Sequence, residues 1–199
     1  VLNTKIDEMY ETVLAMKDHR GNDVRNEVTK IIPRMVRFDK IKFVDKYMHR
    51  VLLYYISQLK IKKDAPSILV SIGDIAVETK NNIVNYLNGI LLESIREGLS
   101  MKSLSKGRRE LIQSCFYCLS KLAVSLGPPL TKFINNYQIL KLVLKSPLTD
   151  NMLSVLQIFI KYLPSLEPII NDRLLNTVSF CLSGYEFRHP GSLDFEELY

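Results

Sequence analysis

The sequence predicts an all-α chain built from stacked pairs of helices. Apolar residues recur at helical spacing along almost all of the 199 residues, and no stretch alternates apolar and polar residues over six or more positions. Starting residues of every second helix also recur at a nearly constant interval. Since 47% of the residues are hydrophobic, the chain has enough apolar surface to bury a sizeable core.

Helix-breaking residues give the order of the elements. Asp23 and Asp64 are expected to cap helices, and Pro66 lies in a first turn, where a missing N–H does no harm. Gly127-Pro-Pro129 and prolines 147 and 164 separate later helices. The predicted pairs are 6–17 with 23–37, 40–59 with 64–78, 81–98 with 107–126, and 130–144 with 149–163, followed by a lone helix at 166–183 and a loop or tail at 184–199.

The start points of alternate helices show a repeat. Asp23, Asp64, Gly107 and Thr149 follow one another at intervals of 41, 43 and 42 residues, which is the spacing of HEAT and armadillo arrays. We therefore expect a single right-handed HEAT-type superhelix of about four and a half pairs, in which each pair packs only against its neighbours. Because the first residue is Val1 and the last pair lacks its second helix, we expect the segment to be cut from a larger protein.

Composition indicates a reducing, water-facing environment. The three cysteines at 115, 118 and 181 are too few and odd in number for a secreted disulfide framework. The longest apolar run, residues 51–56, is far shorter than the roughly 20 residues of a membrane-spanning helix. The start of the chain does not resemble a signal peptide.

No motif for catalysis or cofactor binding stands out. The chain has no glycine-rich phosphate loop, no His-Arg-Asp and no Asp-Phe-Gly, so we expect no ATP site and no cofactor in this chain. Cys115-Phe-Tyr-Cys118 lacks further zinc ligands nearby and lies on an apolar helical stripe, so a core position is expected. That stripe comprises Leu111, Cys115, Leu119, Leu122 and Leu126.

Basic residues concentrate in the turns within pairs, whereas the turns between pairs are nearly neutral. Stacked helices lie about 8–10 Å apart, close to one Debye length, so the charges of successive turns add to one field. We predict a basic ridge that binds an acidic partner segment or anionic lipid; alternatively, these cations only keep the turns soluble. The candidate residues are Lys60, Lys62, Lys63, Lys102, Lys106, Arg108 and Arg109, with Lys17, His19, Arg20 and Lys145 in the outer turns.

Five short runs along the chain are distinctive: Lys30-Ile-Ile-Pro-Arg-Met-Val-Arg-Phe38, Tyr86-Leu-Asn-Gly-Ile-Leu91, Ile95-Arg-Glu-Gly-Leu99, Leu122-Ala-Val-Ser-Leu-Gly-Pro128 and Phe187-Arg-His-Pro-Gly191. In order and spacing they resemble the N-terminal HEAT-repeat region of the TOR (target of rapamycin) kinases. The linker at 100–106 and the helix after it differ from animal members, which indicates a fungal one.

The resemblance implies a very large serine/threonine protein kinase that controls cell growth in response to nutrients. ATP and Mg would bind in its kinase domain, outside this chain. It also implies a scaffold role, with a raptor-like or rictor-like subunit and a second TOR copy as partners. A cytoplasmic location, with peripheral attachment to endosomal, vacuolar or plasma membrane, is expected.

Other functions stay open. The chain could be a HEAT scaffold of another kind, such as a transport receptor or a phosphatase scaffold subunit, but a net charge of +6 and uneven linkers disfavour both. A nucleic-acid-binding helical repeat ranks last, because the second helices carry mostly Ile, Leu, Ser and Val where base contacts would be needed. No small-molecule substrate is expected.

Overall fold

The structure is a computed structural model that describes residues 2–100, 105–146 and 149–183. All regular secondary structure in these residues is helical, so the prediction of an all-α chain is confirmed for them. Lys102 and the predicted tail at 184–199, with its Arg-His-Pro-Gly run at 188–191, lie outside the described residues.

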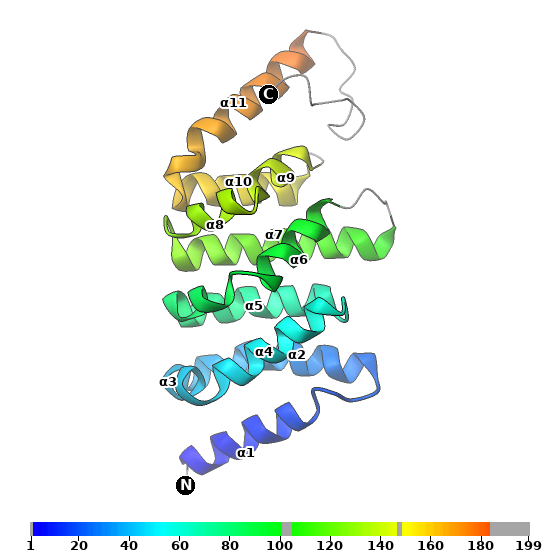
Figure 1. Cartoon of the computed structure of the whole chain (residues 1–199), viewed down its shortest axis with the longest axis vertical. Helices are drawn as coiled ribbons and strands as arrows, with labels where there is room; N and C mark the ends of the chain where they lie inside the picture. The colour runs from blue at the N-terminus through cyan, green and yellow to red at the C-terminus, as the bar shows by residue number, and fades with distance from the viewer. Residues whose placement is uncertain (1, 101–104, 147–148, 184–199) are drawn as a thin grey trace.

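The helices stack in two layers along the long axis of the molecule (Figure 1). In the first layer α4 packs on α6 and α6 packs on α9. In the second layer α2 packs on α5, α5 on α7 and α7 on α10. Each pair thus contributes one helix to each layer and contacts the pairs beside it, as expected of a helical repeat. The first layer holds α1 (Leu2–Ala15), α4 (Met48–Lys60), α6 (Ile90–Ser100), α9 (Ile139–Lys145) and α11 (Glu167–Leu182), and the second holds α2 (Asn22–Phe38), α5 (Ala65–Thr79), α7 (Lys106–Leu126) and α10 (Asp150–Tyr162).

Several helices of the first layer are interrupted where the sequence predicted continuous ones. The segment predicted over 81–98 breaks at Gly89, which adopts a φ of 80° easily because glycine has no Cβ. The segment predicted over 130–144 breaks at Gln138, whose φ is 54°. The two breaks meet, because the Gly89 N–H donates to the Tyr137 hydroxyl at 2.7 Å. The interrupting and flanking elements are α3 (Lys40–Lys42), the π-helical η1 (Phe43–Tyr47), the 3₁₀ helices η2 (Lys80–Tyr86) and η3 (Pro164–Leu166), and α8 (Leu130–Asn136).

The two predicted acidic caps behave differently from expectation. Helix α2 begins after Gly21, and Asp23 lies within its first turn without capping it. Asp64 does occupy the N-cap position of α5, but with a left-handed backbone (φ 52°) and no side-chain cap bond. Its carboxylate instead accepts a hydrogen bond from Arg25. The Thr149 hydroxyl caps α10 by accepting a bond from the Met152 N–H.

Apolar side chains from every pair form one connected core between the layers. Cys115 and Cys118 lie in it fully buried, as predicted. None of the described helices is by itself long and apolar enough to span a membrane. Only α10 taken together with residues 164–179, across a bend of 116°, meets that length and composition test.

Candidate partner-binding surface

The helix ends within pairs lie along one edge of the stack. Figure 1 shows α1 meeting α2, α4 meeting α5, and the ends of α6 and α9 facing the starts of α7 and α10, all at the right edge. The ends that connect successive pairs lie at the left edge. The basic turns predicted from the sequence therefore share an edge, which we call the pair-turn edge.

The turn between α4 and α5 presents three lysines in different settings. Lys60 and Lys63 are exposed and form no ion pair with any described residue. Lys62 has a left-handed backbone, with φ at 56°, and its ammonium lies 3.0 Å from a carboxylate oxygen of Glu97 on α6. Because Glu97 partly neutralises Lys62, the positive charge of this turn rests mainly on Lys60 and Lys63.

The start of α7 carries the next group of cations. Lys106 and Arg109 are exposed, whereas Arg108 is half-buried. The Nε and Nη1 atoms of Arg108 are buried and have no hydrogen-bond partner within residues 2–100, 105–146 and 149–183. Lys102, the fourth candidate here, lies outside the described residues. The exposed charge at this level therefore comes from Lys106 and Arg109, reinforced by the positive end of the α7 dipole.

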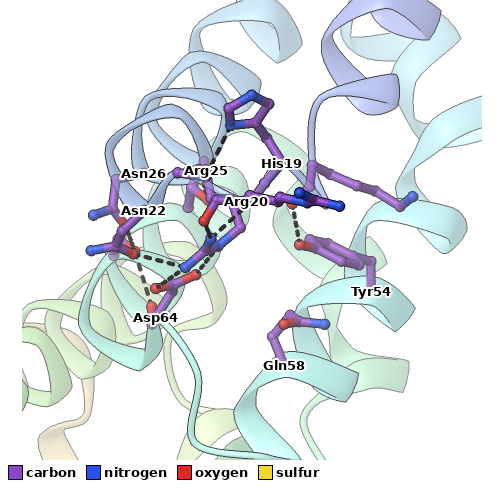
Figure 2. Close-up of polar contacts among 12 residues, drawn as sticks. His19, Arg20, Asn22, Arg25, Asn26, Tyr54, Gln58 and Asp64 are labelled. Atoms are coloured by element: carbon purple, nitrogen blue, oxygen red, sulfur yellow. Dashed lines mark hydrogen bonds and ion pairs between the residues drawn. The ribbon is translucent and has the colours of Figure 1, made fainter.

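Charged side chains at the turn between α1 and α2 form ion pairs and hydrogen bonds with other residues of the chain. Lys17 lies 2.7 Å from Asp18. Arg25, from the start of α2, donates from Nε to Asp64 at 2.7 Å and from Nη1 to the carbonyl oxygens of His19 and Arg20, both at 2.9 Å (Figure 2).

Arg25 uses all five of its N–H donors. Its Nη2 donates to the side-chain oxygen of Asn22 at 3.0 Å and, at 3.4 Å, to the second carboxylate oxygen of Asp64. The hydrogen bond from Arg25 to Asp64 is the main cause that raises the pKa of Arg25. We call this arrangement the Arg25 clamp; it ties the turn between α1 and α2 to the turn between α4 and α5. It was not predicted from the sequence, where its one sign is an arginine about one repeat before an aspartate.

Metal-ligating side chains do not cluster among the described residues. No group of three His, Cys, Asp or Glu side chains among them is placed to hold a metal ion. Burial raises the pKa of the Cys115 thiol to about 12 and also raises that of Cys118. Since the thiolate is the reactive form, both thiols are inert at physiological pH. The side chain of Cys181 lies outside the described residues.

The structure also shows a groove that the sequence analysis did not predict. It is open to solvent, has a volume of about 670 Å³ and lies between α5, α7 and α10. Tyr117 and Val124 on its wall are 37% and 39% exposed. Both fall off the buried stripe of α7 that contains Cys115 and Leu119. Tyr117 and Val124 are apolar residues of α7 that lie outside its buried stripe, and they were the sequence signal that could have indicated the groove.

Two stacked helical layers with a basic edge define a helical-repeat segment. No family model matches the chain. It is 38% identical to the serine/threonine-protein kinase TOR2 of Saccharomyces cerevisiae over 98% of its length. It is also 27% identical to tor1 of Schizosaccharomyces pombe over 90% and 26% identical to TOR of Arabidopsis thaliana over 88%.

The resemblance to the TOR kinases inferred from the sequence is therefore confirmed, and the chain is a TOR-kinase segment of fungal type. It spans only about 8% of the length of the first of these relatives.

Proposed function

We propose that the chain is a scaffold segment of a TOR-type serine/threonine protein kinase, and that its pair-turn edge binds an acidic segment of a companion subunit. The observation that supports this best is a set of exposed cations on one edge of the stack that form no ion pair with the described part of the chain: Lys60, Lys63, Lys106 and Arg109. Because they come from successive pairs, they attract a negatively charged segment that runs along the stack.

The proposal extends to the parent kinase. A raptor-like or rictor-like subunit and a second TOR copy are the proposed partners, the proposed role of the parent is growth control in response to nutrients, and ATP and Mg would bind in a kinase domain elsewhere. We also propose a right-handed superhelix and a cytoplasmic location with peripheral membrane contact. The alternative is a HEAT scaffold of another complex, in which the basic pair-turn edge would bind an acidic segment of a different partner.

The test reverses the four cations in the full-length kinase, by combining Lys60→Glu, Lys63→Glu, Lys106→Glu and Arg109→Glu. The control reverses four exposed lysines at the opposite edge, Lys40, Lys80, Lys132 and Lys161, so the change in net charge is identical. Affinity-purified complexes are then compared for the amount of companion subunit at low and at physiological salt.

Less companion subunit with the first variant but not with the control, and a smaller difference at higher salt, is the expected result. Equal recovery with both variants, or equal loss, would refute the binding role of the pair-turn edge. Binding of the 199-residue chain to nonspecific RNA or DNA, with a steep salt dependence, would instead favour the nucleic-acid alternative.

A further inference from the structure

We propose that Ser105 is a phosphorylation site, and that a phosphoryl group on its hydroxyl weakens the binding of the acidic partner segment to the pair-turn edge. The modification itself follows from the surroundings of Ser105, and only the effect on a partner rests on the proposed function of the edge. The reaction needs ATP and a serine/threonine kinase that selects serines flanked by basic residues.

Ser105 is exposed and its hydroxyl makes no hydrogen bond. It lies at the N-cap position of α7 with an extended backbone, yet its side chain does not cap the helix. At the same position of α10, the Thr149 hydroxyl accepts from the Met152 N–H. Within residues 2–100, 105–146 and 149–183, the other exposed serine whose hydroxyl has no hydrogen bond is Ser179. Most of the remaining exposed hydroxyls donate to a backbone carbonyl, namely those of Thr12, Ser57, Ser100, Ser154 and Ser183.

The start of α7 is open to an enzyme and to a bulky anion. A Cβ on Gly107, two residues after Ser105, would meet no other part of the chain within 4 Å. The first N–H groups of a helix have no acceptor within the helix, and the helix dipole places partial positive charge there. The Ser105 hydroxyl is therefore accessible, and a phosphate bound to it is stabilised by the field of the helix.

Three cations follow Ser105 within four residues. Lys106 and Arg109 are exposed and Arg108 is half-buried. Side chains three and four residues apart are neighbours on a helix surface, so Arg108 and Arg109 lie within reach of a phosphate on Ser105. A guanidinium and a phosphate form charge-assisted hydrogen bonds, often in pairs, which are among the stronger ones in proteins.

Arg108 has donors left over for such bonds. Its Nε and Nη1 atoms are buried, and no residue in the described part of the chain accepts a hydrogen bond from them. Buried N–H groups of a charged side chain are costly to leave unpaired. Arg25, by contrast, uses all five of its donors within the fold. A phosphate on Ser105, one helical turn before Arg108, supplies acceptors for these donors.

The nearest carboxylates leave these cations available. Glu110 is the closest in sequence, but five residues of α-helix place it about 140° around the axis from Ser105 and about 7.5 Å along it. On α6, Glu97 is paired with Lys62 at 3.0 Å. Ion pairs among the described residues include none of the three cations that follow Ser105.

The sequence around Ser105 indicates the kinase class. Lys106 follows it directly, which excludes a proline-directed kinase, and the first acidic residue after it is Glu110. A kinase with an acidic substrate groove fits these cations best. In the reaction, the Ser105 Oγ bonds to the γ-phosphorus of ATP and the bond from that phosphorus to the bridging oxygen breaks. ADP leaves, and the hydroxyl proton passes to the catalytic base of the kinase.

Phosphorylation changes the charge of the pair-turn edge at the level of α7. The group adds about −1.5 to −2 charges at neutral pH, against the three cations there. Because its oxygens bind Arg108 and Arg109 of the same chain, an acidic partner segment meets a much less basic surface. Lys60 and Lys63 keep their charge, so we expect weaker binding of the partner rather than none.

The first experiment incubates the 199-residue chain with Mg-ATP and a purified kinase that selects serines flanked by lysine and arginine, and maps the modified residues by mass spectrometry. Ser105 is expected to be modified and Ser179 is not, because Ser179 is also exposed and unbonded but has no lysine or arginine within five residues. Ser105→Ala should remove the main signal. Modification of Ser103 in place of Ser105 overturns the proposal, as does no modification at all.

The second experiment installs phosphoserine by genetic encoding at position 105 or, as the control with the same added charge, at position 179. Phosphorus NMR then measures the second pKa of each phosphate, which is ordinarily about 6. The pKa at position 105 is expected to lie at least about half a unit below that at position 179, because nearby cations favour the dianion. Arg108→Gln should reverse much of this difference. Equal pKa values at the two positions overturn the contact with the cations.

The third experiment places the same two phosphoserines in the full-length kinase and compares the recovered companion subunit. Recovery is expected to fall about threefold with phosphoserine at 105 and to stay unchanged with phosphoserine at 179. If the four-cation reversal lowers recovery and phosphoserine at 105 does not, the regulatory effect is refuted and the edge stands. If neither lowers recovery while the phosphate pKa is shifted, the phosphorylation site stands and the proposed function of the edge falls.

Discussion

The first two helix pairs and the last two are joined in different ways. Across the first junction, Asp7 contacts Lys42 and Lys46, Glu11 contacts Arg50, and further ion pairs connect Arg25 to Asp64 and Arg37 to Glu78. Among the residues that the structure describes, the second junction has one ion pair, Lys62 with Glu97.

At the third junction the described residues share no ion pair, and the polar contact there is the bond from Gly89 to Tyr137. Apolar packing carries that end of the stack, through residues such as Leu130, Ile134, Val155 and Phe159. A constant repeat length therefore does not imply a constant mode of attachment. The charged junction fixes its register by specific partners, whereas the apolar junction depends on shape.

Removal of a large apolar side chain from the C-terminal half is expected to have the largest effect. Phe159 on α10 is fully buried, and Phe159→Ala should lower the free energy of unfolding by about 3–5 kcal/mol. Hydrogen exchange should show loss of protection first in α8–α11, with α1–α5 little changed, because each pair stabilises mainly its neighbours. Uniform loss of protection along the chain would contradict the separation of the two halves.

The next largest effect is expected at the Arg25 clamp. The side chains of Arg25 and Asp64 are only 11% and 14% exposed, so Arg25→Met leaves a largely buried carboxylate without its partner. The double variant Arg25→Met/Asp64→Asn should recover part of the loss in thermal unfolding. If the two single effects simply add in this cycle, the pair contributes no specific coupling and the contrast with the apolar junction weakens.

Close packing between the two layers of one pair offers a smaller effect. A Cβ on Gly98 of α6 would lie 2.8 Å from the Cys115 Sγ on α7, so Gly98→Ala should destabilise the chain by about 1–3 kcal/mol. Gly107→Ala is the control, because nothing lies within 4 Å of its Cβ position. There the same substitution should stabilise α7 by about 0.5–1 kcal/mol. Urea titration of both variants measures these opposite signs.

Acid should weaken the charged junction selectively. The pKa of Asp7 lies well below its usual range, chiefly because Tyr47 donates a hydrogen bond to its carboxylate, followed by Lys42. A carboxylate with a lowered pKa adds stability above its unfolded value of 3.8, and that stability is lost as the pH falls through the folded value.

Asp7→Asn should therefore show a smaller drop in its urea midpoint than the unmodified chain on going from about pH 5 to about pH 2. Asp45→Asn, an exposed carboxylate in the neighbouring π-helix, serves as the control. A difference of the same size in both variants would show that the Asp7 contacts are not responsible.

The positions of the helices could be predicted from the sequence, because apolar periodicity, prolines and a repeat near 42 residues are local signals. The break at Gly89 has a local signal, the turn-forming dipeptide Asn88-Gly89, whereas the break at Gln138 has none. Gln138 adopts a left-handed backbone that its own chemistry does not favour, so neighbouring packing imposes it. The fate of Asp64 was equally hidden, since its partner Arg25 lies 39 residues earlier and competes with the local cap.

The candidate surface shows the same limit. That basic turns share an edge follows from stacking alone and could be predicted. That Lys62 is paired with Glu97, while Lys60 and Lys63 remain exposed, depends on which helix lies across the turn. The groove depends on how α5, α7 and α10 lie against one another, which appears only in three dimensions.

The hydrogen bond between Gly89 and Tyr137 has a mechanical consequence. It joins two interrupted helices of neighbouring pairs at their breaks, and the described residues of that junction share no ion pair. A pulling force along the stack is therefore opposed by fewer polar contacts there than at the first junction, which has the Arg25 clamp and further ion pairs. Under tension the helix pairs should separate first near Gly89 and Tyr137. A load applied by a large assembly would then be absorbed at this link, leaving the charged junction in register.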